Sequence, residues 1–107
     1  MLGLKVHKAA RNDLADVLAY YSAISPDLPE AFLGQFAIAV SLLLDRPEVG
    51  PTRFAHLFPS INLRTWSLDR FPFRLFYTVR GNTLHLLRVD HERRDVRPGS
   101  LKRKPRS

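Results

Sequence analysis

A chain of 107 residues is long enough for one compact domain with a modest core, and too short to divide into two. It has no cysteine, which excludes disulfides, thiolate metal sites and cysteine nucleophiles, and it lacks the run of roughly 18 apolar residues expected of a membrane span. We therefore expect a cytoplasmic protein with no membrane partner and no targeting segment.

The positive charge is concentrated at the C-terminal end. The formal net charge is +7, but residues 97–107 hold five basic side chains and no acidic one. Residues 1–96 therefore carry twelve basic and ten acidic side chains, a net charge of only +2. This balance does not indicate a generic nucleic-acid binder, whose basic residues would be spread over a binding face. We predict a single domain over 1–97 and a flexible basic tail over 98–107.

The spacing of apolar residues predicts a short strand followed by two helices. Leu4 and Val6 alternate with polar neighbours, as in a strand. Helical spacing then predicts one helix over 10–24 and a second over 30–44, separated by the proline-containing breaker SPDLP. Because the connection is short, the two helices are expected to form an antiparallel hairpin.

The pattern then changes to that of strands. INLRTWSL, FPFRLFYTV and TLHLLRVD are rich in β-branched and aromatic residues, and Gly81-Asn82 between the last two is a two-residue hairpin signal. The predicted class is therefore α+β, with an N-terminal strand, a helical hairpin and a three-stranded antiparallel meander.

The hairpin turn also predicts a register, which pairs Tyr77 with Leu86, Phe76 with Leu87 and Arg74 with Val89. The face expected to pack under the helices holds Phe73, Leu75, Tyr77, Val79, Leu84, Leu86 and Arg88. The open face is expected to hold Arg74, Phe76, Thr78, Arg80, Thr83, His85, Leu87, Val89, His91 and Arg93. Arg74, His91 and Arg93 should then converge at one end of the sheet.

Motifs of common catalytic and cofactor sites are absent from the sequence. It has no Walker phosphate loop, dinucleotide glycine fingerprint, HExxH or paired Cys/His spacing, and its serines lack a nucleophile-elbow context. The four histidines are scattered rather than spaced as ligands. We predict no metal and no cofactor.

The segment RVDHERRD, residues 88–95, carries the densest charge and allows two interpretations. Arginine forks bind phosphate and histidine transfers protons near neutral pH, so Arg74, His91 and Arg93 are chemically competent for RNA cleavage. Alternatively, the three acidic residues of the segment neutralise Arg93 and Arg94 in an ion-pair network. Composition alone favours the network.

The order and spacing of these motifs resemble the ParE/RelE superfamily of toxins from type II toxin-antitoxin systems. The resemblance covers residues 4 to about 97 and rests on AxxDLxxVxxYY in the first helix, RPExG after the second, and FPFRLFY with LLRVxHERRD in the strands. It implies the α+β fold predicted above and neutralisation by a cognate ParD-like antitoxin. It also allows a higher-order toxin-antitoxin oligomer.

This superfamily has two functional branches. RelE-like members are ribosome-dependent endoribonucleases that cut mRNA, whereas ParE-like members inhibit DNA gyrase. Arg74 matches an arginine that RelE-like enzymes use to hold phosphate, and His91 and Arg94 fall in the C-terminal basic motif. In the ribonuclease alternative these three residues would be catalytic, and the ribosome and mRNA would be the partners.

Departures from the RelE pattern favour the ParE branch. No tyrosine follows residue 77, and the loop GPTRFAHLFPS has no pair of lysines. The resemblance therefore implies a non-enzymatic inhibitor of DNA gyrase. The residues expected to bind its target are Arg64, Arg74, His91, Arg93 and Arg94.

Overall fold

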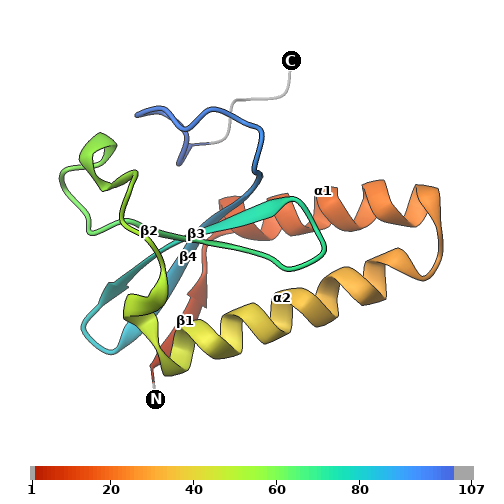
Figure 1. Cartoon of the computed structure of the whole chain (residues 1–107), viewed down its shortest axis with the longest axis horizontal. Coiled ribbons are helices and arrows are strands. Elements are labelled where there is room, and N and C mark those ends of the chain that lie inside the picture. Colours follow the sequence, from red (N-terminus) through yellow and green to blue (C-terminus); the bar gives the residue numbers. More distant parts are fainter. Residues whose placement is uncertain (1, 103–107) are drawn as a thin grey trace.

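The computed structural model describes residues 2–102, in which two helices pack on one face of a four-stranded sheet (Figure 1). In chain order the elements are β1 (Gly3–Val6), α1 (Lys8–Ile24), α2 (Leu28–Asp45), the 3-10 turns η1 (Pro47–Val49) and η2 (Ala55–Leu57), β2 (Arg64–Ser67), β3 (Phe73–Arg80) and β4 (Thr83–His91). The predicted α+β class is confirmed.

The sheet is mixed and has the strand order β1-β4-β3-β2. β2, β3 and β4 form the expected antiparallel meander. β1 adds to the outer edge of β4 in parallel, pairing Gly3–Val6 with residues 83–86. Because α1 begins two residues after β1 ends, this pairing brings the start of α1 beside the middle of β4.

Both helices begin two residues earlier than the pattern predicted, and they lie side by side as a hairpin (Figure 1). Pro29, expected to interrupt the chain, lies in the first turn of α2. A proline there removes no helical hydrogen bond, because the first N–H groups of a helix have no partner within the helix. α2 is long and apolar enough to cross a membrane by length and composition, a test that core helices of globular domains also pass.

The main core lies between the helices and the sheet. Its buried helical side chains are Ala10, Val17, Phe32, Ala39, Val40 and Leu43, and its buried strand residues are Leu75, Tyr77, Leu84, Leu86 and Val89. Aromatic rings close one end, where Phe71 meets Tyr21 and Phe32 edge to face with ring centroids 5.3 and 5.4 Å apart. Such contacts add about 0.5–1.5 kcal/mol each beyond area burial.

A smaller core covers the opposite face of the sheet. Phe58, Leu63 and Phe76 are buried there, and Val96 and Leu101 pack against them from the segment after β4. Figure 1 shows the η2 loop and this C-terminal segment on the side of the sheet away from the helices. Residues 98–102, expected to belong to a flexible tail, therefore contact the domain, while 103–107 lie outside the described residues. The domain boundary at residue 97 stays a prediction.

A β-bulge in β4 changes which residues share a face. The predicted pairing holds from the turn as far as Tyr77, but Phe76 then lies opposite Arg88 rather than Leu87. One extra residue in β4 shifts every later pair by one position. Val89, predicted on the open face, is consequently buried in the main core. The register prediction is wrong beyond this point, because alternation of residue types does not reveal a bulge.

The loop between α2 and β2 is held by the hydroxyl of Tyr77. This hydroxyl donates to the carbonyl oxygen of Pro47 at 2.8 Å and accepts from the N–H of Gly50 at 3.0 Å. A Cβ at Gly50 would collide with the hydroxyl and would lie 2.6 Å from the carbonyl oxygen of Thr65. Glycine at this position is therefore required by the close approach of the chain.

Replacing Gly50 should test this anchor. We expect Gly50→Ala to lower the free energy of unfolding by about 1–3 kcal/mol, because the loop must move off Tyr77. Gly34→Ala is the matched control, since a Cβ there meets nothing within 4 Å. In the middle of α2 it should raise stability by up to about 1 kcal/mol. Urea denaturation measures both changes, and a neutral Gly50→Ala would contradict the anchor.

Candidate functional site

The end of β4 is tied to α1 by a buried ion pair. Nε of Arg88 donates to Oδ2 of Asp13 at 2.6 Å, and Nη2 donates to Oδ1 at 3.0 Å. The backbone N–H of Val89 donates to the same carboxylate at 2.9 Å. Both side chains of the pair are only 7% exposed. The bidentate geometry offsets part of the cost of removing two charges from water.

The position of Asp13 in the sequence indicates that it has a buried partner. Asp13 stands between Ala10 and Val17 at helical spacing, so it shares the buried face of α1 with them. A carboxylate in that position needs a cationic or hydrogen-bonding partner. Because Arg88 lies 75 residues away along the chain, the sequence does not show which partner Asp13 has.

The same arginine holds the segment that follows β4. Nη1 of Arg88 donates to the carbonyl oxygen of Ser100 at 2.8 Å, and the Ser100 hydroxyl accepts from the N–H of Arg97 at 2.7 Å. Leu101, next in the chain, packs into the smaller core. Arg88 therefore connects α1, β4 and the C-terminal turn.

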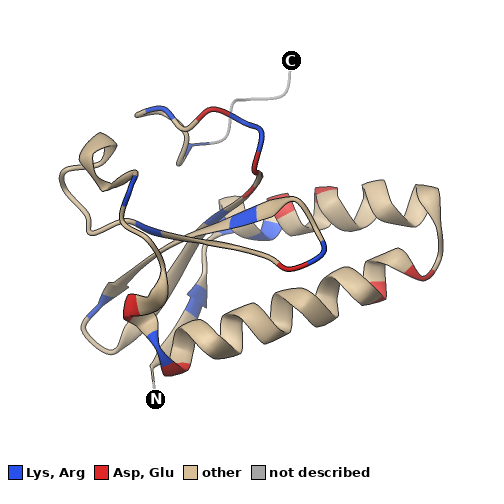
Figure 2. Ribbon diagram, viewed as in Figure 1, with Lys and Arg blue, Asp and Glu red and all other residues tan. Residues whose placement is uncertain are grey.

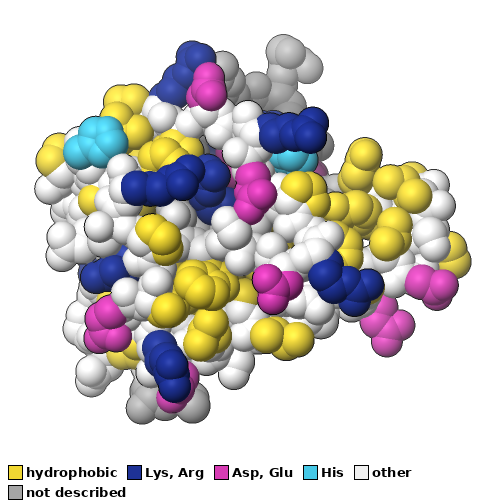
Figure 3. All heavy atoms as spheres, in the orientation of Figure 1, with side chains coloured by type: hydrophobic (Ala, Val, Ile, Leu, Met, Phe, Trp, Pro, Cys, Tyr) yellow, Lys and Arg dark blue, Asp and Glu magenta, His cyan; other side chains and the backbone are white. Residues whose placement is uncertain are grey.

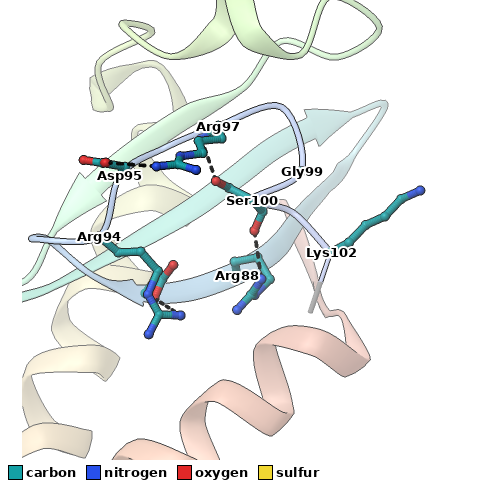
Figure 4. A pocket seen from close by; sticks show the side chains of 8 residues that line it. Arg88, Arg94, Asp95, Arg97, Gly99, Ser100 and Lys102 are labelled. Atoms are coloured by element: carbon teal, nitrogen blue, oxygen red, sulfur yellow. Dashed lines mark hydrogen bonds and ion pairs between the residues drawn. The ribbon is translucent and has the colours of Figure 1, made fainter. Parts of the chain in front are cut away.

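A pocket of about 640 Å³ lies between the end of β4 and this turn (Figure 4). Its charged lining consists of Arg88, Arg94, Arg97, Lys102, Asp90 and Asp95. Basic and acidic residues are interspersed along the chain after β4 (Figure 2). Arg94 pairs with Asp90 at 3.3 Å and Arg97 with Asp95 at 3.5 Å. Asp90 neutralises Arg94 as the ion-pair interpretation expected, whereas Asp95 turns to Arg97.

The predicted convergence of Arg74, His91 and Arg93 is not found. Beyond the bulge, His91 lies opposite Phe73 and so shares its face, whereas Arg74 points to the other face. The His91 ring contacts Phe73 with centroids 5.4 Å apart, and its Nδ1 accepts from the N–H of Arg93 at 3.1 Å. The bulge thus separates the histidine from Arg74.

Arg64, also expected to bind the target, supports the loop after α2. Its Nη1 donates to the carbonyl oxygens of Glu48 at 2.9 Å and Gly50 at 2.8 Å. These bonds occupy one end of the guanidinium and leave its other donors for further contacts. A role for Arg64 in target binding stays a prediction.

Arg74 is the most unusual of the predicted site residues. It is only 9% exposed, yet its side chain forms no hydrogen bond or ion pair with any described residue. Its Cζ lies 5.1 Å from the ring centroid of Phe54, and Arg53 lies over the same ring at 4.6 Å. Figure 3 shows Lys and Arg side chains next to hydrophobic ones on one face of the molecule. Burial lowers the pKa of the Arg74 guanidinium, and Arg53 lowers it further.

A second polar contact joins His7, the residue between β1 and α1, to His85 of β4. Nε2 of His7 lies 2.8 Å from Nδ1 of His85, so one ring donates a proton to the other. Burial lowers the pKa of His7, and His85 and Lys5 lower it further. No group of three His, Cys, Asp or Glu side chains among residues 2–102 could hold a metal.

Comparison with known proteins identifies the family. The model of the family described as "ParE toxin of type II toxin-antitoxin system, parDE" matches residues 4–96. This chain belongs to the ParE toxin family. The family likeness read from the sequence is thereby confirmed, and the chain is a toxin of the type II toxin-antitoxin class.

A solved structure agrees with the ParE assignment. The chain is similar to one described as "Chromosomal ParDE TA system from P. aeruginosa", with a TM-score of 0.70 and 26% identity. The match covers 85% of this chain and 96% of the other. No curated protein matches significantly.

The histidine contact predicts a pH dependence of stability. The pKa of His7 in the folded state lies below its usual value of 6.5, so the unfolded chain binds the proton more readily. The contribution of His7 is fully present above pH 6.5 and is lost as the pH falls through its folded pKa.

Thermal melts across this range test the contact. As the pH falls below 6.5, the wild type should lose more stability than His7→Gln, in which this titration is removed. His56→Gln is the control, because His56 is exposed and takes no part in the His7–His85 contact. Equal losses in the wild type and His7→Gln would contradict the prediction.

Proposed function

We propose that this ParE-family toxin inhibits DNA gyrase without breaking a bond itself, and that a ParD-like antitoxin neutralises it in the cytoplasm. The observation that carries the choice of target is the bulge in β4, which puts His91 and Arg74 on opposite faces. The family match and the similarity to a ParDE system support the toxin assignment.

The alternative, ribosome-dependent cleavage of mRNA, requires groups that act on one phosphate. A general base must lie within hydrogen-bond reach of the proton it removes, while a cation holds the phosphate. His91 instead accepts a backbone N–H with one ring nitrogen, and Arg94 pairs with Asp90. These contacts leave Arg74 without an acid or base beside it from the proposed catalytic set.

The proposed antitoxin is supported by exposed apolar side chains on the helical hairpin. Tyr20 and Ile24 of α1 and Leu33 and Ile38 of α2 are exposed. In Figure 3 hydrophobic side chains gather over the part of the hairpin that extends beyond the sheet. Apolar surface of this kind marks sites of protein association. A partner that folds on binding would cover it.

The target can be identified with two assays on the purified toxin. We expect it to inhibit supercoiling by gyrase and to accumulate cleaved DNA. It should leave mRNA intact on translating ribosomes. Codon-positioned cuts in mRNA, with supercoiling unaffected, would instead assign the toxin to the ribonuclease branch.

Arginine variants distinguish the same two mechanisms. If Arg74 held a scissile phosphate, Arg74→Ala would lower activity by about 10²-fold or more. A gyrase inhibitor has no chemical step of its own, so we expect at most a modest loss of potency. The double change Arg93→Ala/Arg94→Ala, or truncation from His91, should weaken inhibition more. Melting temperatures show whether a variant still folds, and lost toxicity in a stable Arg74→Ala protein that no longer cuts mRNA would refute the proposal.

A further inference from the structure

Arg74 carries a buried charge whose hydrogen-bonding capacity is unused. A guanidinium has five N–H donors, and buried polar groups in folded proteins almost always have partners. Arg74 is only 9% exposed, and its side chain donates to no described residue. Leaving such a group buried and unpaired lowers stability. A group retained at this cost suggests a partner supplied from outside the chain.

The neighbouring acids do not fill that role. Asp90 lies opposite Arg74 on β4, but its Oδ1 binds Arg94 and accepts the N–H of His91 at 2.9 Å. Glu92 and Asp90 both favour the charged form of Arg74, yet neither forms an ion pair with it. Neither acid therefore accepts a hydrogen bond from the Arg74 guanidinium.

The surroundings of Arg74 hold its guanidinium in place. The Phe54 ring lies within cation–π distance of both guanidinium groups, which restricts where they can move. Arg53 is exposed, so its charge remains available at the surface next to Arg74. A preorganised fork with a second cation beside it matches a carboxylate, which accepts two parallel hydrogen bonds from arginine.

A protein carboxylate fits this position better than nucleic acid. Two guanidinium groups already cover the Phe54 ring, so it does not offer the free aromatic face on which a base stacks. Residues 1–96 also have a net charge of only +2, which is low for a surface that follows a phosphate backbone. An acidic side chain needs only the local pair of cations.

We propose that Arg74 and Arg53 form a binding site for a carboxylate side chain of the antitoxin. This inference rests on the antitoxin partnership proposed above and names the contact within it. The free toxin keeps Arg74 unpaired, and the complex supplies the missing acceptor. The antitoxin thereby gains a charge-assisted contact that the free toxin cannot satisfy internally.

The test uses the full-length toxin and the protein encoded next to its gene, co-expressed, purified and separated. Affinity is measured by calorimetry for the wild type, Arg74→Met and Arg74→Lys. Arg46→Met is the control, because Arg46 is an exposed arginine whose ion pair is with Asp45 at the end of α2. We expect Arg74→Met to weaken binding by about 10- to 100-fold and Arg74→Lys by about tenfold. Arg46→Met should bind as the wild type does.

The melting temperature of the free toxin separates a binding role from a structural one. Removing an unpaired buried charge should leave the melting temperature of Arg74→Met unchanged or higher. A marked decrease would show that Arg74 stabilises the fold and would overturn the inference. Unchanged antitoxin affinity, or a loss confined to gyrase inhibition, would overturn it as well.

A double-mutant cycle identifies the carboxylate. Each Asp and Glu of the antitoxin is replaced by its amide, and the acid that contacts Arg74 should lose its effect in the Arg74→Met background. If the change in binding free energy on replacing each acid simply adds to that of Arg74→Met, the inference is overturned. If the wild-type toxin forms no complex with the neighbouring protein, the partnership itself fails, and this inference fails with it.

Discussion

The buried pair of Asp13 and Arg88 is the interaction on which the rest of the structure depends. One carboxylate accepts two bonds from the guanidinium and one from the backbone of Val89. The remaining end of the guanidinium holds the C-terminal turn through Ser100. Breaking a buried pair by removing one partner costs about 3–5 kcal/mol, because the other charge remains buried without compensation. Helix, sheet and C-terminal turn are therefore linked through a single arginine.

This pair lies at the bulge that decides what each face of the sheet can do. The extra residue in β4 places Val89 in the main core and His91 on the face of Phe73. Arg74 lies on the opposite face, next to Phe54 at the smaller core. The histidine and the arginine that a regular strand would have placed on one face are thus on opposite faces. This arrangement favours binding, which is the mode of action proposed for a gyrase inhibitor, over cleavage.

Much of the fold could be predicted because it follows from local patterns. The period of apolar residues identified both helices, and the Gly81-Asn82 turn gave the first pairs of the hairpin. What could not be predicted depends on contacts between distant segments. Three features are of this kind. They are the bulge in β4, the pairing of Asp13 with Arg88, and the packing of Leu101 into the smaller core. The roles of the candidate site residues stay predictions, and the bulge decides which of them share a face of the sheet.

The account is tested most directly by amide hydrogen exchange in Asp13→Asn. If Arg88 links the elements as described, the amides of Val89, Arg97 and Ser100 should exchange faster together, by about tenfold or more. The amides that form hydrogen bonds between β2 and β3 should keep their protection. Asp45 is exposed, and its variant Asp45→Asn should exchange as the wild type does. Faster exchange of the Val89 amide with no change at Arg97 and Ser100 would show that the C-terminal turn is held independently and would contradict the linking role of Arg88.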